Sequence, residues 1–132
     1  LANGKFQPLI PDDTVKPGKA SKLVFTSGKI YYELMERRDE LQKKDVAIIR
    51  IEQLYPFPVE TVRNIIYENK NAKSKLWVQD EPENMGAWPY IARKYPGLNL
   101  ELISRPESAS PAGGLMEQHK RRLERILEAV FK

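Results

Sequence analysis

The stretch from Val46 to Pro58 constrains the fold of this chain more than any other, and it reads VAIIRIEQLYPFP. Its first six residues, which end at Ile51, are mostly apolar and rich in β-branched side chains, as is typical of a strand buried on both faces. Pro56 and Pro58 then end the strand, and the fixed φ of Pro58 suits the first turn of a helix. A buried strand that turns directly into a helix is half of a βαβ unit, so the sequence predicts an α/β fold.

The same alternation continues along the chain. Strands are predicted at residues 22–26, 46–51, 75–79 and 98–104, and helices at residues 29–43, 59–68, 85–94 and 115–131. Short connections between alternating strands and helices indicate a largely parallel sheet with helices on both faces and right-handed crossovers. Residues 1–21 lack periodicity and contain several prolines and glycines, so they are predicted to be a linker that enters one domain at residues 22–132.

Helical spacing predicts which side chains face the core. The helix at residues 29–43 follows Ser27, its predicted N-cap. Its inward residues are predicted to be Ile30, Leu34 and Leu41, whereas its charged residues, including Arg38, should face water. The next helix is predicted to bury Val59, Val62, Ile65 and Ile66.

The only histidine of the chain lies on the predicted apolar stripe of the last helix. That stripe consists of Leu115, His119, Leu123, Ile126 or Leu127, and Val130. A histidine in such a position is more often a satisfied, partly buried side chain than a catalytic base. The sequence therefore favours a structural role for His119.

Composition excludes several classes of protein. The chain has no cysteine, which rules out disulfide frameworks and thiolate metal sites and fits a reducing compartment. It has neither a run of roughly 18 apolar residues nor a signal-peptide core, so no membrane association is predicted. The formal net charge is +4, but acidic and basic residues interleave. Nucleic-acid binding is therefore disfavoured relative to an ordinary solvated surface.

Loops at the carboxyl ends of parallel strands are where binding groups usually gather. Ser27, Gly28 and Lys29 have the location of a phosphate-binding turn but lack the glycines of a nucleotide loop, so a capping turn is favoured. Residues 80–88, DEPENMGAW, place three carboxylates after a strand, where they could bind a metal or act as an acid and a base. With no histidine nearby, a structural or interface loop is favoured, in which Glu83 or Asn84 caps the next helix.

Residues 105–114, RPESASPAGG, form the third loop. Arg105, Ser108 and Ser110 could hold a carboxylate or a phosphate just before a helix. An ordered loop that packs against another domain is the favoured alternative. Because the sequence contains neither cysteine nor a histidine beside a serine nucleophile, it assigns no catalytic, cofactor-binding or metal-binding residue.

Three segments, in this order, resemble those of one family: IRIEQLYPFP at residues 49–58, QDEP at 79–82 with Asn84, Gly86, Ala87 and Trp88, and RPxSASPAxG at 105–114. The family is the C-terminal domain of the thiamine-diphosphate-dependent decarboxylating component of the 2-oxoglutarate dehydrogenase complex. The residues SGKIYY at 27–32 also fit, and the resemblance spans about residues 22–132. One departure is Asp80, where many members carry glutamate.

The resemblance implies a transketolase C-terminal-like fold, a three-layer α/β/α sandwich around a mostly parallel sheet that usually has five strands and one antiparallel edge. The pattern predicts four strands, so a fifth either lies within residues 5–20 or escapes the pattern. The whole enzyme would be an oxidoreductase of the tricarboxylic acid cycle. It would bind thiamine diphosphate and magnesium, decarboxylate 2-oxoglutarate and pass the succinyl group to a lipoyl arm.

Those steps are expected in preceding domains, because the sequence motif of a thiamine-diphosphate site is absent here. The isolated chain is therefore expected to be inactive and to bind no cofactor. Its implied partners are the upstream catalytic domains, the second subunit of a homodimer and the lipoyl acyltransferase component. The implied location is the bacterial cytoplasm or the mitochondrial matrix.

The loops at the carboxyl ends of the strands could form an active site, but the resemblance favours a docking surface for other domains at this edge of the sheet. The predicted interface residues are Tyr55, Phe57, Glu81, Asn84 and Trp88. The alternative is a regulatory module, in which Arg105, Ser108 and Ser110 hold an anionic effector such as a nucleotide or an acyl-coenzyme A.

Overall fold

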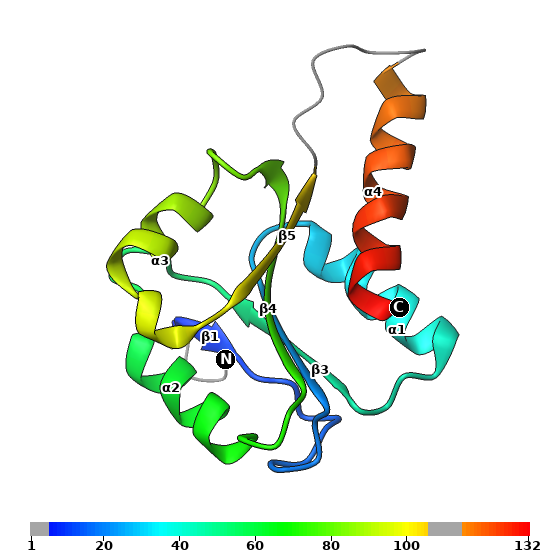
Figure 1. The fold of residues 1–132 in the computed structure, drawn as a ribbon. Coiled ribbons are helices and arrows are strands. Elements are labelled where there is room, and N and C mark those ends of the chain that lie inside the picture. The colour runs from blue at the N-terminus through cyan, green and yellow to red at the C-terminus, as the bar shows by residue number, and fades with distance from the viewer. Residues whose placement is uncertain (1–5, 106–114) are drawn as a thin grey trace.

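A computed structural model describes residues 6–105 and 115–132 of the chain (Figure 1). The described elements are β1 (Leu9–Ile10), β2 (Lys22–Thr26), α1 (Ile30–Leu41), β3 (Val46–Ile51), α2 (Val59–Glu68), β4 (Ser74–Pro82), α3 (Trp88–Lys94), a 3₁₀ turn (Pro96–Leu98), β5 (Glu101–Arg105) and α4 (Leu115–Phe131). The strands form one sheet in the order β1-β3-β2-β4-β5. β2 to β5 pair in parallel, and β1 is antiparallel to β3.

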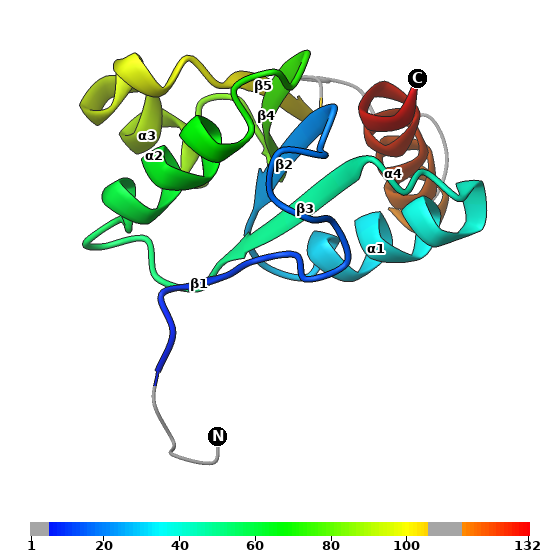
Figure 2. The same cartoon turned by 90° about the horizontal axis from the view of Figure 1, so that it is seen from below.

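Helices cover both faces of the sheet (Figure 2). One core lies under α2 and α3 and contains Phe25, Ile49 and Trp77, all less than 3% exposed. The other lies under α1 and α4 and contains the strand residues that alternate with these, such as Val24 and Val78. Successive side chains of a strand point to opposite faces, so each central strand contributes to both cores. The predicted three-layer α/β/α sandwich is confirmed.

The fifth strand comes from the segment that precedes the first predicted strand. Leu9 pairs with Ile51 and Ile10 with Arg50, which makes β1 a short antiparallel edge. Its two residues are too few to show a periodicity, yet the expectation of a strand within residues 5–20 is confirmed. Part of the predicted linker therefore lies in the sheet.

Two polar side chains hold residues 12–20 against the domain. The Asp12 carboxylate, whose side chain is 3% exposed, pairs with the Arg38 guanidinium and accepts a hydrogen bond from the Ile48 amide at 2.8 Å. At the other end, the Asn69 carboxamide oxygen accepts from the Gly18 amide at 2.8 Å, and its nitrogen donates to the Ile65 carbonyl at 3.0 Å. The entry segment is thus tied to β3 and to the end of α2.

The buried face of α1 differs from the prediction. Arg38 is 4% exposed, whereas Leu41, in the last turn, is 46% exposed. Arg38 follows Leu34 by four residues and so lies on the same face, where Asp12 neutralises it. The predicted cap is also wrong, because the helix begins after Lys29 without a side-chain cap.

The later elements confirm the prediction apart from their ends. α3 starts at Trp88 rather than near residue 85, and neither Glu83 nor Asn84 caps it. α4 buries Ile126, Leu127 and Val130 as predicted, but Leu115 is 83% exposed and His119 is exposed rather than partly buried. The first turns of α4 extend past the body of the domain, so the apolar stripe has nothing to pack against there (Figure 1). No helix in residues 6–105 and 115–132 is long and apolar enough to cross a membrane.

We predict that Asp12→Asn lowers the unfolding free energy of the 132-residue chain by about 3 kcal/mol, because it leaves the Arg38 charge buried and unpaired. Burial by itself would raise the pKa of Asp12, but the hydrogen bonds from Ile48 and Thr14 and the charge of Arg38 outweigh it and lower that pKa. The carboxylate therefore stabilises the fold above about pH 4, and this stabilisation disappears as the pH falls through the folded-state pKa.

Urea denaturation at pH 7 and at a series of lower pH values measures both effects. The matched control is Asp13→Asn at the exposed neighbouring acid, which should change stability by less than about 0.5 kcal/mol. Equal losses in the two variants, or a difference from wild type that does not shrink on acidification, would contradict the prediction.

Candidate functional site

The carboxyl ends of the parallel strands meet at one edge of the sheet, which we call the carboxyl edge. Its described parts are residues 27–29 with the first turn of α1, residues 52–58 and 83–87, and the first turn of α4 (Figure 1). β1 runs antiparallel to β3, so the residues that enter it, including Phe6, lie at this edge too. Residues near both ends of the described chain therefore lie on this side of the sheet, although they lie apart from each other (Figure 1).

Exposed apolar side chains gather at the carboxyl edge. Six of the eight large hydrophobic residues that are exposed in the described chain belong to its segments: Phe6, Tyr32, Tyr55, Met85, Leu115 and Met116. The other two, Leu41 and Tyr67, lie in the last turns of α1 and α2, near the amino ends of the strands. Single exposed apolar residues are ordinary, but a concentration of them at one edge is typical of an interaction surface.

The Gln79 side chain organises the loop that follows β4. It is 3% exposed, and its oxygen accepts hydrogen bonds from the Trp77 indole at 2.9 Å and from the Trp88 amide at 3.1 Å. Its nitrogen donates to the carbonyls of Pro82 at 2.9 Å and Met85 at 2.8 Å. Both halves of the buried carboxamide are thus satisfied, and residues 80–88 are held in one conformation.

Gly86 lets this loop close over Gln79. Its φ is +68°, a left-handed conformation that glycine adopts at little cost. A Cβ atom at this position would lie 3.2 Å from the Gln79 oxygen and 3.2 Å from Glu81. The turn therefore combines a backbone requirement with a close approach. α3 begins two residues later, at Trp88.

Aromatic rings form a continuous cluster from the exit of β3 to α3. Phe57 is buried and stacks on Tyr95, with 5.4 Å between ring centroids. Tyr90 contacts Tyr95 at 6.0 Å and Tyr55 at 4.6 Å, in both cases edge to face. A hydrogen bond with Tyr95 raises the pKa of the Tyr90 hydroxyl. Tyr55, 63% exposed, is thus the outer ring of a cluster that is anchored in the core.

Arg50, at the end of β3, connects that strand to the start of α1. Its guanidinium carbon lies 5.1 Å from the centroid of the Tyr31 ring and 5.0 Å from that of Tyr32. It also donates to the Tyr32 hydroxyl at 2.8 Å and pairs with Glu52 at 2.9 Å. Burial and the charge of Asp12 raise the pKa of Tyr31. Arg50 fixes the position of Tyr32 on this edge.

Sequence comparison decides the family. Residues 1–131 match the family model described as 2-oxoglutarate dehydrogenase C-terminal. The chain belongs to this family. It is 39% identical to the 2-oxoglutarate dehydrogenase E1 component of Cupriavidus necator and 40% identical to that of Haemophilus influenzae, over 99% and 97% of its length. It is 38% identical, over 96% of its length, to the human 2-oxoadipate dehydrogenase complex component E1.

The chain spans only 14% of each of these three relatives. The matched 2-oxoglutarate and 2-oxoadipate dehydrogenase proteins are about equally similar to it. This C-terminal domain therefore does not by itself separate the two substrate classes.

The family's characteristic loops occupy different environments in this 2-oxoglutarate dehydrogenase C-terminal domain. Of the residues predicted for a domain interface, Tyr55, Glu81 and Asn84 are exposed, Trp88 is half-buried and Phe57 is buried. Phe57 supports the surface from within the core. The prediction that these residues contact another domain stays a prediction.

The predicted anion site lies only partly within the structure. Arg105 is half-buried at the end of β5, beside Pro82, whereas Ser108 and Ser110 lie outside the described residues. Within residues 6–105 and 115–132, no three histidine, cysteine, aspartate or glutamate side chains are placed to hold a metal ion. His119 is exposed, with its Nδ1 atom 3.4 Å from the Arg122 guanidinium.

Sequence reasoning missed the residues that shape this edge from beneath. Gln79 and Arg50 enter the sequence analysis only as members of a predicted strand and of a family motif, and Tyr90 has no role in it. The one available signal is a glutamine that directly follows the apolar run Leu76–Val78, a few residues before a glycine. A buried carboxamide needs several partners, and a turn with free carbonyls supplies them.

We predict that Gly86→Ala lowers the unfolding free energy by roughly 2 kcal/mol, because alanine is strained at a φ of +68° and its methyl group would press on Gln79. Urea denaturation followed by tryptophan fluorescence measures this loss and also reports on the environment of Trp77 and Trp88. Gly97→Ala is the matched control, because a Cβ atom there meets nothing within 4 Å. It should leave stability unchanged or raise it by about 0.5 kcal/mol. Equal effects at both glycines would be evidence against the constraint.

Proposed function

We propose that this chain is the non-catalytic C-terminal assembly domain of a thiamine-diphosphate-dependent 2-oxoglutarate dehydrogenase E1 component. The whole enzyme would decarboxylate 2-oxoglutarate oxidatively and transfer the succinyl group to a lipoyl group of the acyltransferase component. The domain would dock through its carboxyl edge onto the upstream catalytic domains of a homodimer.

The observation that carries this proposal is the concentration of exposed apolar side chains at the carboxyl edge. Tyr55, Met85 and Leu115 are each more than half exposed, although they come from three separate parts of the chain. Burying such side chains against another domain is favourable at about 25 cal/mol for each Å² of apolar surface. Residues 6–8 lead into β1 from the same edge, so the preceding polypeptide would lie close to it.

The edge is also rigid, which favours docking. Gln79 holds the loop after β4, Arg50 holds Tyr32, and Tyr90 and Tyr95 support Tyr55. A surface that is ordered before it binds loses little conformational freedom on association. These contacts give the described part of the edge one conformation before any partner binds.

The described residues do not fit the cofactor of the whole enzyme. Magnesium prefers carboxylate and carbonyl oxygens together with phosphate oxygens. Asp80 and Glu81 follow one another on β4, and in the described part of the chain no third histidine, cysteine, aspartate or glutamate is placed to complete a metal site with them. Thiamine diphosphate and magnesium are therefore assigned to the upstream domains in this proposal.

We predict that Tyr55→Asp in the full-length enzyme destabilises docking, because a charge replaces an aromatic ring at a contact that excludes water. Decarboxylation of 2-oxoglutarate, measured with an artificial electron acceptor, should fall about tenfold or more, and the thermal transition of the enzyme should shift downward. Tyr67→Asp is the matched control, because that tyrosine is 71% exposed but lies away from the carboxyl edge. Unchanged activity in both variants would refute docking through this edge.

We further predict that the isolated 132-residue chain folds but binds neither thiamine diphosphate nor magnesium tightly. Isothermal titration calorimetry with both ligands should show no saturable heat, whereas the full-length enzyme should titrate normally. Circular dichroism of the same sample verifies that the chain is folded. Micromolar binding to the isolated chain would show that a cofactor site lies within it.

A further inference from the structure

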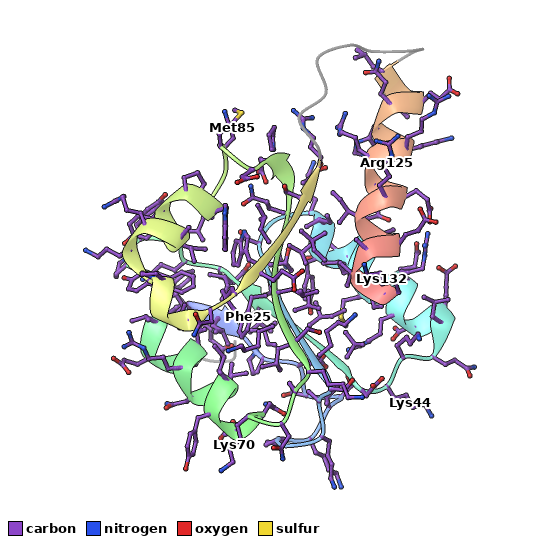
Figure 3. All side chains as sticks on the ribbon, viewed as in Figure 1. Phe25, Lys44, Lys70, Met85, Arg125 and Lys132 are labelled. Carbon is purple, nitrogen blue, oxygen red and sulfur yellow. The ribbon has the colours of Figure 1, made fainter. Side chains whose placement is uncertain are left out.

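Lysines dominate the edge of the sheet opposite the carboxyl edge. The segments that lead into the strands there, together with the end of the last helix, carry nine of the thirteen lysines of the chain: Lys16, Lys19, Lys22, Lys43, Lys44, Lys70, Lys73, Lys75 and Lys132. We call this surface the lysine edge. Figure 3 labels Lys44 and Lys70, which follow α1 and α2 toward the lower side of the view, and Lys132, which follows α4 higher up on the right.

The positive charge of the lysine edge is largely unneutralised. Residues 16–22, 43–46, 68–75, 99–101 and 132 contain three acidic residues, Asp45, Glu68 and Glu101, against nine lysines, whereas the whole chain has a formal net charge of +4. Asp13, Asp39 and Glu128 lie just outside these ranges. Every ion pair found in the described part of the chain uses an arginine, and none uses a lysine of this edge. Seven of the nine lysines are exposed, and the other two, Lys22 and Lys75, are half-buried.

Two of these lysines, Lys43 and Lys132, lie close enough to Lys22 to repel its charge, while Asp45 and Glu101 partly offset them. The Lys22 ammonium donates to the Val130 carbonyl at the end of α4. Burial, followed by the charges of Lys43 and Lys132, lowers the pKa of Lys22. An arrangement that holds like charges together gains stability when an anionic partner approaches.

Two apolar side chains accompany these charges. Leu41 ends α1 and Tyr67 lies in the last turn of α2, and they are the exposed large hydrophobic residues that do not belong to the carboxyl edge. The Lys70 ammonium lies 5.4 Å from the centroid of the Tyr67 ring. An exposed tyrosine among charged residues is typical of a protein–protein contact, where aromatic rings provide much of the binding energy.

We propose that the lysine edge is a docking surface for an acidic face of another folded protein component of the dehydrogenase complex. This inference rests on the proposed function, because docking through the carboxyl edge leaves the lysine edge facing outward. The interleaved acids Asp45, Glu68 and Glu101 match a mixed protein surface better than a continuous polyanion. Lysine, a strongly hydrated point charge, favours fast and reversible association over tight bidentate binding.

The test uses the full-length enzyme and, as the probe, the acyltransferase component of the same complex. The variant is Lys44→Glu, Lys70→Glu and Lys73→Glu together, all at exposed positions. The matched control reverses three exposed charges away from both ends of the strands, by Arg63→Glu, Lys120→Glu and Arg125→Glu. The apparent KM for the acyltransferase component in the overall reaction should rise roughly tenfold in the variant and less than about twofold in the control. At 0.5 M NaCl the difference should vanish, because salt screens the attraction.

Decarboxylation with an artificial acceptor and the oligomeric state are measured on the same samples. Both should be normal in the variant, and a loss of either would point to the assembly proposal rather than to the lysine edge. An unchanged KM with normal decarboxylation would overturn the inference. It would also be overturned if the variant kept its KM but lost salt-sensitive binding to a DNA duplex or to phosphatidylglycerol vesicles, because the partner would then be a polyanion.

Discussion

The structure depends above all on the burial of its three central strands from both sides. Residues 23–26, 46–49 and 76–79 each form a run of four consecutive buried residues in neighbouring strands. Such runs leave no face for water, so helices have to cover both sides of the sheet and the crossovers must supply them. Once both faces are covered, the only exposed parts of the sheet are its two outer strands and the loops at the ends of the strands. Functional surfaces are thereby confined to those loops and to the outer sides of the helices.

This two-sided core contains polar side chains that form specific hydrogen bonds or ion pairs. The Thr26 hydroxyl donates to the Val78 carbonyl at 2.7 Å and links two strands beyond their backbone ladder. Gln79 links β4 to the loop that follows it, and the Asp12–Arg38 pair links the segment before β2 to α1. Buried polar groups of this kind add little net stability. However, any alternative arrangement that leaves them buried without hydrogen-bond partners is higher in free energy. They therefore define one conformation for the segments that a purely apolar core would leave loosely placed.

The two ends of the strands consequently differ in chemistry. The carboxyl edge combines rigid loops with apolar and aromatic groups, as suits a permanent contact within one protein. The lysine edge combines long hydrated side chains with few opposing charges, as suits a contact that forms and dissociates. Both surfaces rest on the same three strands, so one small domain can be held firmly on one side while it presents a charged face on the other.

The sequence by itself determined the α/β class, the order of strands and helices, the apolar faces of α2 and the last turns of α4, and the family. These follow from local periodicity and from short motifs, which depend on neighbours along the chain. Only the tertiary structure decided that Arg38 is buried, that β1 exists, that Gln79 organises a loop and that Leu115 and His119 are exposed. Asp12 lies 26 residues from Arg38, and the paired strand residues Leu9 and Ile51 are also far apart in sequence. Such contacts form only when distant segments are brought together by folding. The same is true of the point at which a helix extends past its sheet. Local periodicity in the sequence therefore predicts neither of them.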